Sequence, residues 1–267
     1  MKAAERVWRD IESIRRGAPL IHNITNYVVM NTTANALLAI GASPVMAHAL
    51  EEVEEMAGLS AALVINIGTL SGPWIESMRK AAGLARRAGI PIVLDPVGAG
   101  ATRFRTETAR RFLEETPPAI LRGNASEVLA LARDEKGTKG VDSLRTPDEA
   151  RESAGRLAVR YGCVVSVSGA ADLITNGSSS AIVLNGHPLM PRVTGLGCAA
   201  SALSGAFAAV NPDPFRAAVH AMAVMGIAGE IAAAGAEGPA SFQVRFIDAL
   251  YNLEAGEISN RLRLECD

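Results

Sequence analysis

A regular alternation of short apolar runs with helix-length segments constrains the fold of this chain more than any other feature. The runs "ALVINIG" (Ala62–Gly68), "IPIVLDPVG" (Ile90–Gly98) and "CVVSVSG" (Cys163–Gly169) are almost entirely apolar or small, as strands covered on both faces are. Segments with helical periodicity, around Trp74–Arg87 and Thr106–Glu115, follow the first two runs. Because strand–helix alternation favours parallel strands joined by right-handed crossovers, the pattern predicts an α/β fold with a mainly parallel sheet.

The remaining segments extend this architecture. "AILRGNASEVLALA" (Ala119–Ala132) predicts a strand, a turn and a helix, and a further helix is expected over Asp148–Tyr161. In Ala171–Gly186 two β-like runs flank an Asn-Gly pair, which predicts a β-hairpin at the sheet edge. Helices are then expected over Cys198–Val210, Phe215–Ala234 and Ser241–Asn252. We therefore expect one α/β domain over residues 1–267, with a helical C-terminal third.

The composition excludes several classes of partner. The net charge is −2 and no long basic block occurs, which argues against nucleic acid and anionic membranes as partners. Gly17–Leu50 and Val193–Pro212 contain no Asp, Glu, Lys or Arg, but they carry small polar residues, Gly or Pro every few positions, which makes them too polar to span a membrane. We expect both stretches to be buried in a core, a pocket or a subunit interface.

The cysteines and the N-terminus bear on the cellular compartment. The three cysteines are odd in number, far apart and without metal-ligand spacing. The opening segment "MKAAERVWRDIESIRR" predicts a charged amphipathic helix and does not resemble a signal peptide. We therefore expect a cytoplasmic protein with reduced thiols.

Polar residues follow the predicted strands at the places where α/β sheets bind their ligands. They are Asp95, Arg122, Asn124, Glu127, Ser168 and the turn Thr194–Gly197. The turn would present backbone N–H groups at a helix N-terminus, which is an anion site. Asp95 and Glu127 offer carboxylate oxygens for Mg²⁺, and Arg122 offers a fixed positive charge for phosphates. Together they indicate phosphoryl transfer.

Each of these residues also has a structural explanation. The Gly-x-Gly of the turn can be a tight turn only, Asp95 can open a turn before Pro96, and Asn124 with Glu127 can form a helix capping box. Ser168 is an ordinary residue after a strand, and Met46 is more typical of a core than of a pocket. Cys163 is expected to be a small core residue and Cys266 to be inert.

Five stretches in order carry a resemblance to a known family. They are "IHNITNYVVMNTTANALLAIGASPVMA", "ALVINIGTL", "PIVLDPVGAGAT", "ILRGNASEV" and "RVTGLGCAASAL". The chain resembles the hydroxyethylthiazole kinases of the ribokinase-like superfamily over nearly its whole length. The resemblance implies a three-layer α/β/α domain that uses ATP and Mg²⁺ to phosphorylate the primary alcohol of 4-methyl-5-(2-hydroxyethyl)thiazole. It also implies a homotrimer with active sites at subunit boundaries.

The resemblance assigns roles to individual residues. Met46 and Gly195 match substrate-binding positions, Arg122 and Ser168 match ATP-binding positions, and Asp95 and Glu127 match acidic residues near the metal and phosphates. Cys198 matches the position at which most ribokinase-like enzymes place an aspartate base. A helix N-terminus lowers the pKa of a thiol, so we expect Cys198 to act as a thiolate general base. A loose phosphoryl-transfer transition state tolerates a weak base.

Other functions compete with this one. A dinucleotide-binding dehydrogenase would need an acid closing a strand after the Gly-x-Gly, but a helix and Pro212 precede Asp213. A hydrolase or acyltransferase with Cys198 as nucleophile would need an adjacent base and an orienting acid. A non-enzymatic binding protein would not need the acidic, Arg and Gly positions together. Within the superfamily, kinases of pyrimidine or pyridoxal alcohols are the nearest alternative.

Overall fold

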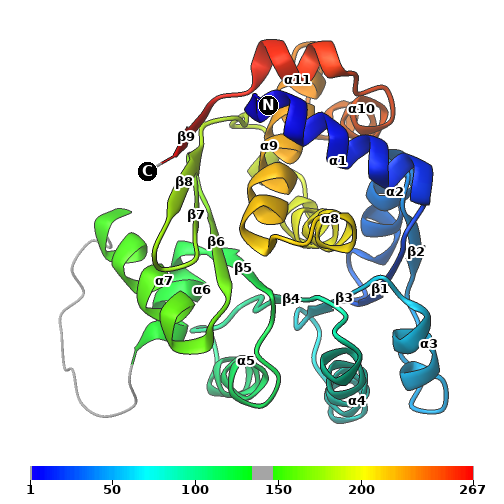
Figure 1. The fold of residues 1–267 in the computed structure, drawn as a ribbon, viewed down its shortest axis with the longest axis vertical. Coiled ribbons are helices and arrows are strands. Elements are labelled where there is room, and N and C mark those ends of the chain that lie inside the picture. Colours follow the sequence, from blue (N-terminus) through cyan, green and yellow to red (C-terminus); the bar gives the residue numbers. More distant parts are fainter. Residues whose placement is uncertain (1, 134–146, 267) are drawn as a thin grey trace.

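The described residues form a nine-stranded mixed sheet between two layers of helices (Figure 1). The computed structural model describes residues 2–133 and 147–266. The strand order is β2-β1-β3-β4-β5-β6-β7-β8-β9, parallel from β2 to β6 and antiparallel from there on. The strands are β1 (Leu20–Ile24), β2 (Ser43–Val45), β3 (Ala62–Asn66), β4 (Ile92–Asp95), β5 (Ile120–Asn124), β6 (Val164–Ser168), β7 (Asp172–Thr175), β8 (Ser180–Val183) and β9 (Leu264–Cys266).

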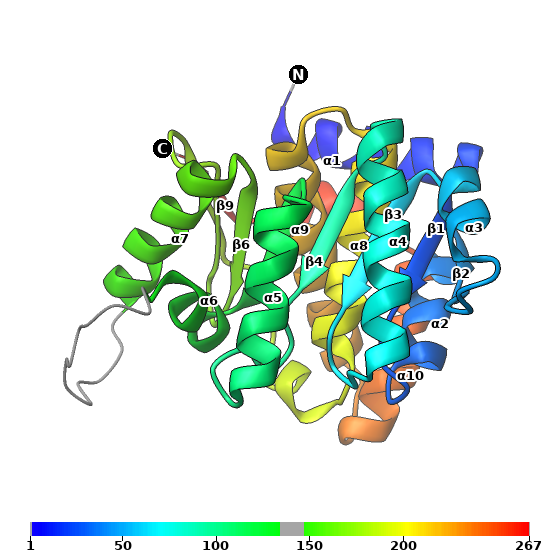
Figure 2. The same cartoon turned by 90° about the horizontal axis from the view of Figure 1, so that it is seen from below.

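One helical layer covers each face of the sheet (Figures 1 and 2). The first layer holds α1 (Ala3–Gly17), α2 (Met30–Ile40), α8 (Leu196–Val210), α9 (Pro214–Ala233), α10 (Pro239–Tyr251) and α11 (Ala255–Arg261). The second holds α3 (Val53–Leu59), α4 (Gly72–Ala88), α5 (Arg103–Glu115), α6 (Ala125–Ala132) and α7 (Pro147–Tyr161), and a short 3-10 helix, Met190–Arg192, precedes α8. The predicted three-layer α/β fold is confirmed.

The central strands supply side chains to two cores. In β3, Ala62 and Val64 belong to the core beneath α8 and α9, whereas Leu63 and Ile65 belong to the core on the opposite face. Successive side chains of a strand point to opposite faces, so a strand buried on both faces must be apolar at every position. This is why "ALVI" shows no alternation of apolar and polar residues.

The uncharged stretch Val193–Pro212 contains the whole of α8, which lies close against the sheet. A Cβ built on Gly205 would lie 2.6 Å from Cγ2 of Val64, so only a residue without a side chain allows this approach. Within the described ranges, α9 alone is long and apolar enough to cross a membrane, and 78% of its apolar window is buried. α9 is accordingly a core helix of this fold.

The other uncharged stretch is only partly core. It forms β1, α2 and β2, and Ile21, Leu37 and Ile40 are fully buried. Tyr27 and Val28, in the same stretch, are exposed at 63% and 66%.

The sequence correctly predicted the hairpin β7–β8, but β8 pairs with β9. The expectation that the hairpin closes the sheet edge is therefore wrong by one strand, because the last residues of the described chain add β9.

A buried polar cluster ties the first helical layer together. Asp10 of α1 is 4% exposed, and its Oδ2 lies 2.6 Å from both Nδ1 of His220 in α9 and Nδ2 of Asn211, which follows α8. Burial raises the pKa of Asp10, but the hydrogen bonds from His220 and Asn211 outweigh it and hold that pKa below its ordinary value. The carboxylate thus joins three helices.

We predict that Asp10→Ala lowers the free energy of unfolding by about 3 kcal/mol at pH 7, because it leaves buried donors without an acceptor. A carboxyl whose pKa is lowered on folding stabilises the fold above its unfolded pKa and loses this effect as the pH falls through the folded pKa. The difference from wild type should therefore shrink below about pH 4. Urea unfolding at several pH values measures it. The exposed Glu12→Ala on the same helix is the control, and equal stability of the two variants at pH 7 would contradict the account.

Candidate active site

The candidate active site lies at the carboxyl ends of the parallel strands, where four strands end in a polar residue. Asn66 ends β3 and pairs in register with Asp95 at the end of β4. Asn124 ends β5 and pairs in register with Ser168 at the end of β6. Parallel register therefore brings residues far apart in sequence to one edge of the sheet. The N-terminus of α8 lies at the same edge, because Ser201 and Gly197 of α8 contact Asp95 and Arg122.

Asp95 is the most deeply buried acid of this edge. Its side chain is 1% exposed, and its Oδ2 accepts hydrogen bonds from Nδ2 of Asn66 and Oγ of Ser201, both at 2.7 Å. Burial raises the pKa of Asp95 to about 6, although the charge of Arg122 and the two hydrogen bonds oppose the rise. Burial therefore makes ionisation of Asp95 unfavourable, while two hydrogen bonds stabilise the carboxylate once it is ionised.

Cys198 lies in the first turn of α8 and faces the ends of β1 and β3. Its Sγ is 3.5 Å from Nδ2 of Asn26. Burial, followed by the charge of Asp95, raises the pKa of Cys198 to about 11, although hydrogen bonding from Asn66 and Asn26 opposes the rise. The prediction of a lowered thiol pKa is therefore wrong for this state. A helix N-terminus stabilises an anion by about 1 kcal/mol, which is less than burial and a neighbouring carboxylate cost.

The turn before α8 has the geometry expected of an anion site. Gly195 is the N-cap residue with φ of 87°, a left-handed conformation that favours glycine. A Cβ on Gly195 would lie 3.0 Å from Cγ1 of Val29, and one on Gly197 would lie 3.0 Å from Nη1 of Arg122. The turn therefore presents bare backbone, and the first N–H groups of α8 have no partner within the helix.

Arg122 and Ser168 line a cavity of about 940 Å³ beside this turn. Nη1 of Arg122 donates to the carbonyl of Gly197 at 3.0 Å, and its Nε is buried without a partner among the described residues. Oγ of Ser168 lies 3.4 Å from the carbonyl oxygen of Gly123. Met222, Met225 and Gly226 form an apolar wall of the same cavity. The cavity thus combines a buried cation with an apolar wall, which suits a ligand with charged and apolar parts.

Glu127 forms the capping box of α6. Its Oε2 accepts from the N–H of Asn124 and its Oε1 from the N–H of Gly98, both at 2.8 Å. The structural explanation given for Asn124 and Glu127 is therefore confirmed, and a metal role for Glu127 stays a prediction. Glu127 also raises the pKa of Asp95 electrostatically, so the two carboxylates belong to one site. No group of three metal-ligating side chains occurs among residues 2–133 and 147–266.

Met46 follows the carboxyl end of the edge strand β2, which is parallel to β1, and its carbonyl lies 3.2 Å from Nδ1 of His48. It is not among the described residues that line the large cavity. A smaller cavity of about 390 Å³ is lined by residues that include His48, two positions after Met46 in the sequence, together with Tyr27 and Trp74. The structure brings together Cys198, Asp95, Arg122, Ser168 and Gly195, and Met46 follows the carboxyl end of β2 at the same edge of the sheet. A substrate-binding role for Met46 stays a prediction.

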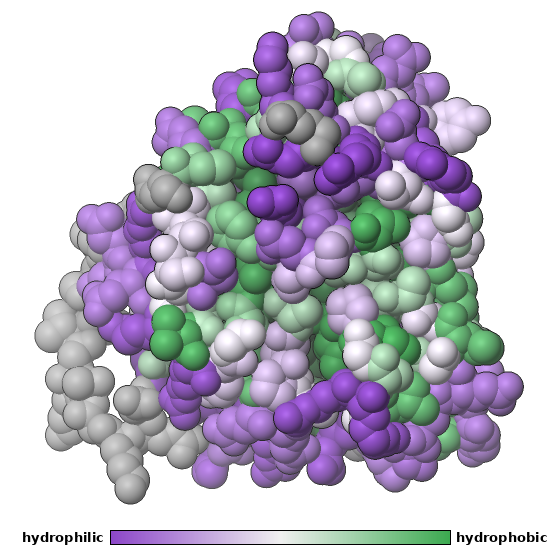
Figure 3. Space-filling view, viewed as in Figure 1, coloured by the Kyte–Doolittle hydropathy of each residue, from purple (hydrophilic) through white to green (hydrophobic). Residues whose placement is uncertain are grey.

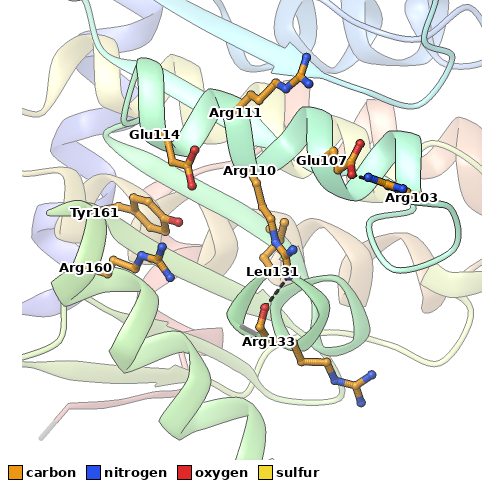
Figure 4. A pocket seen from close by; sticks show the side chains of 9 residues that line it. All are labelled: Arg103, Glu107, Arg110, Arg111, Glu114, Leu131, Arg133, Arg160 and Tyr161. Atoms are coloured by element: carbon orange, nitrogen blue, oxygen red, sulfur yellow. Dashed lines mark hydrogen bonds and ion pairs between the residues drawn. The ribbon is translucent and has the colours of Figure 1, made fainter. Parts of the chain in front are cut away.

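A third cavity, of about 440 Å³, lies among the outer helices α5, α6 and α7 (Figure 4). Charged side chains dominate its lining, and most come from α5. Arg110 points toward the end of α6 and donates to the carbonyl oxygens of Ala130 and Arg133 (Figure 4). Arg110 therefore helps to hold α5 against the end of α6. The cavity contains none of the strand-end residues, so it is not the candidate site.

Sequence reasoning missed three residues of the site. Asn26 follows β1, Asn66 ends β3, and Ser201 lies one turn after Cys198 on α8. The rule that strand ends carry chemistry would have found both asparagines, and the helical spacing of three residues would have placed Ser201 on the face of Cys198. All three lie inside the stretches that carry the family resemblance, but the sequence by itself assigned no role to any of them.

Comparison with known proteins identifies the family of this chain. The model of the hydroxyethylthiazole kinase family matches residues 11–256. The chain is 58% identical to a hydroxyethylthiazole kinase of Oleidesulfovibrio alaskensis over 94% of this chain and 95% of the relative, and 58% identical to one of Syntrophus aciditrophicus over 97% of each. The solved structure of a hydroxyethylthiazole kinase from Pyrococcus horikoshii superposes with a TM-score of 0.92 at 45% identity, over 98% of this chain and 99% of that one.

A more distant structure shows the same fold. The pyridoxal kinase of Staphylococcus aureus in complex with pyridoxal superposes with a TM-score of 0.66 at 15% identity, covering 93% of this chain and 97% of that one. At this identity the likeness concerns the fold alone. It agrees with the three-layer architecture described above.

We predict that Asp95→Asn raises the free energy of unfolding by about 1–3 kcal/mol at pH 8, because it removes a buried charge. A carboxyl whose pKa rises on folding opposes folding progressively as the pH rises from its unfolded to its folded pKa. The gain should therefore be absent near pH 4, grow up to about pH 6 and stay constant above. Urea unfolding between pH 4 and 8 measures this profile. A loss of stability at pH 8 would show that the carboxylate itself supports the fold.

Proposed function

The chain belongs to the hydroxyethylthiazole kinase family, and on this basis we propose that it transfers the γ-phosphoryl group of ATP to the primary hydroxyl of 4-methyl-5-(2-hydroxyethyl)thiazole. The observation that carries the proposal is the juxtaposition of Cys198, Asp95 and a bare helix N-terminus beside a large cavity that contains Arg122. The family membership names the substrate, and this juxtaposition supplies the groups that phosphoryl transfer needs.

We propose that the 940 Å³ cavity holds the nucleotide. The apolar wall at Met222 and Met225 suits a base, and Arg122 and the first turn of α8 suit the phosphates. The orphaned Nε of Arg122 supports this assignment, because a buried donor without a partner gains most from an added phosphate oxygen. Ser168 would add a hydroxyl donor at the same edge.

Magnesium fits the oxygen donors of the site. Mg²⁺ is held by one or two carboxylates together with substrate phosphates and waters, so Asp95 and Glu127 suffice without a third protein ligand. When bound, the ion neutralises charge on the transferring phosphoryl group. Oδ1 of Asp95 is the oxygen for this role, because Oδ2 already accepts two hydrogen bonds.

We propose that Cys198 is the general base. The alcohol oxygen attacks the γ-phosphorus, its proton passes to Sγ of Cys198, and the bond from the γ-phosphorus to the bridging oxygen breaks as ADP leaves. A thiol with a pKa of about 11 is protonated at neutral pH, so only a small thiolate fraction is active there. The loose transition state places little charge on the attacking oxygen, which makes a weak demand on the base.

A cysteine hydrolase or acyltransferase fits the site poorly. A nucleophilic thiol needs an adjacent base that removes its proton. The side chains that hydrogen-bond Sγ are the amides of Asn26 and Asn66, which cannot accept a proton at ordinary pH. Hydrogen-bond donors surround Sγ of Cys198, and this supports its role as the acceptor of the alcohol's proton. No observation favours a pyrimidine or pyridoxal alcohol over the thiazole.

We further propose a cytoplasmic homotrimer built from single kinase domains over residues 1–267. Tyr27 and Val28 are exposed in the uncharged stretch that precedes Met46, and a neighbouring subunit would cover them. The site beside Met46 would then be completed at a subunit boundary. The thiols of the three cysteines are free, as in a reducing compartment. The two cores share one sheet, which supports a single domain.

We predict that the enzyme releases ADP with hydroxyethylthiazole faster than with pyrimidine or pyridoxal alcohols. We also predict that Cys198→Ala lowers kcat by about 10²–10⁴ and no more, because positioning of the substrates and stabilisation of the phosphoryl charge remain in the variant. A coupled ADP-release assay on the substrate panel measures both. Complete loss of turnover in a folded Cys198→Ala variant, with a covalent adduct on the wild-type enzyme, would indicate a nucleophile. Faster turnover of a pyrimidine alcohol would reject the substrate assignment.

We predict that the wild-type protein sediments as a trimer at micromolar concentration. Tyr27→Glu combined with Val28→Glu should weaken the trimer, because two buried charges in an apolar contact are costly. Val244→Glu, at an exposed position on α10, is the control. A stable and active wild-type monomer in sedimentation velocity would contradict the proposed assembly.

A further inference from the structure

The side-chain amide of Asn66 lies between the two groups to which the proposed function assigns the chemistry. Its Nδ2 donates to Oδ2 of Asp95 at 2.7 Å, and its oxygen accepts from Nδ2 of Asn26, which itself lies 3.5 Å from Sγ of Cys198. Hydrogen bonding from the same Asn66 side chain also lowers the pKa of Cys198. An asparagine amide carries two N–H groups, so one can serve each acceptor. Asn66 is 1% exposed and is absent from the motif residues discussed so far as catalytic.

The orientation of this amide is fixed from its other end. Oδ1 of Asn66 accepts from Nδ2 of Asn26 at 2.8 Å and from the N–H of Gly68 at 3.0 Å. The amide of Asn26 is oriented in turn, because its Oδ1 accepts from the N–H of Val28 at 3.1 Å. A backbone N–H can only donate, so neither amide can rotate by a half-turn without losing its contacts. The N–H groups of Asn66 therefore must face Asp95 and Cys198.

The backbone around Asn66 leaves room for this arrangement. A Cβ on Gly68 would lie 2.6 Å from Nδ2 of Asn26 and 2.8 Å from its Cβ, so a side chain at position 68 would displace Asn26. Ser201 completes the set by donating to the same Oδ2 of Asp95 at 2.7 Å. Residues from the loop after β1, from β3, from β4 and from α8 thus form one connected network.

The carboxylate of Asp95 and the sulfur of Cys198 would repel one another if both carried a negative charge during the reaction. In the proposed function Asp95 is ionised when it binds metal, and the sulfur of Cys198 is a thiolate before it takes the proton. Donors placed between like charges offset their repulsion, and hydrogen bonds to charged groups are stronger than those between neutral groups. Arg122 is the cation that faces the pair from β5.

We propose that Asn66 is a positioning residue for phosphoryl transfer, whose amide holds the Asp95 carboxylate and the Cys198 sulfur in fixed places by donating one N–H to each. This inference rests on the proposed function for the identity of the reaction. The arrangement of Asn66 itself stands on the contacts of the fold. Its removal should impair the chemical step and spare substrate binding, because Asn66 acts through Asp95 and Cys198.

The test uses two variants of Asn66 and a matched control. Asn66→Asp keeps the shape and the acceptor oxygen for Asn26 and Gly68, but it replaces both donors. Asn66→Ala removes the whole amide. Asn23→Ala is the control, because Asn23 is a fully buried asparagine of the neighbouring strand β1 whose Nδ2 donates to the carbonyl of Ile21. Thermal unfolding confirms that each variant is folded.

Two readouts decide the proposal. Steady-state kinetics should give a kcat lower by about a hundredfold in both Asn66 variants, with the KM for the thiazole within about threefold of wild type, because the loss is one of positioning. The rate of iodoacetamide alkylation of Cys198 at pH 8.5, followed by mass spectrometry of the peptide, should fall by about three- to tenfold in Asn66→Asp as thiolate is lost. Asn23→Ala should change neither readout.

Unchanged alkylation of Cys198 together with a kcat within about threefold of wild type in folded Asn66→Asp would overturn the inference. A raised KM with an unchanged kcat would overturn it as well, since Asn66 would then contact substrate. The alkylation readout needs no kinase activity. If the wild-type enzyme fails to phosphorylate the thiazole, the proposed function fails while the alkylation comparison still decides the role of Asn66.

Discussion

The burial of an ionisable carboxyl, that of Asp95, is the constraint on which the rest of the site depends. A carboxylate that is almost fully removed from water is unfavourable unless hydrogen bonds and nearby positive charge compensate it. Asn66 and Ser201 provide the hydrogen bonds, and Arg122 provides the positive charge. A pKa of about 6 leaves Asp95 mostly ionised at neutral pH. The fold thus keeps the buried Asp95 mostly in the ionised form that can bind a cation.

The architecture explains how these groups meet. Parallel strands end at one edge, so Asn66, Asp95, Asn124 and Ser168 are aligned by register alone. α8 brings its N-terminus to that edge because its small residues let it pack closely on the sheet, as Gly205 does over Val64. The first turn of α8 then separates two sides of the site. Arg122 and Ser168 line the large cavity, whereas Cys198 faces Asn26 and Asn66.

The architecture was predictable from the sequence because it follows from local patterns. The apolar runs of β3, β4 and β6 and the Asn-Gly turn of the hairpin β7–β8 determine strands and turns without knowledge of their neighbours. β9 was missed because a three-residue strand at the end of the described chain has no periodicity to read. The motif residues Asp95, Arg122, Ser168 and Gly195 do meet at one edge of the sheet, as strand-end reasoning implies. Their roles remain predictions.

The electrostatics of the site were not predictable from the sequence. The thiol pKa depends on how deeply Cys198 is buried and on the nearness of Asp95, which lies over a hundred positions away in the sequence. Asn26, Asn66 and Ser201 were missed for a similar reason, because each is an ordinary polar residue until its partner on another element is known. Met46 matched a motif, but it follows the edge strand and is not among the described residues that line the large cavity, so its role stays a prediction. Contacts between distant segments decide such questions.

The central claim is that Cys198 takes the proton of the alcohol as a base with a high pKa, and the pH dependence of the chemical step in wild type and Cys198→Asp tests it most directly. Single-turnover rates of the wild-type enzyme should rise by about tenfold per pH unit between pH 7 and 9, because the thiolate fraction grows in that way below the pKa. Cys198→Asp should react at least as fast at pH 7 and show a nearly flat profile, because its carboxylate is already ionised. A flat wild-type profile, or a folded Cys198→Asp variant without activity, would contradict the claim.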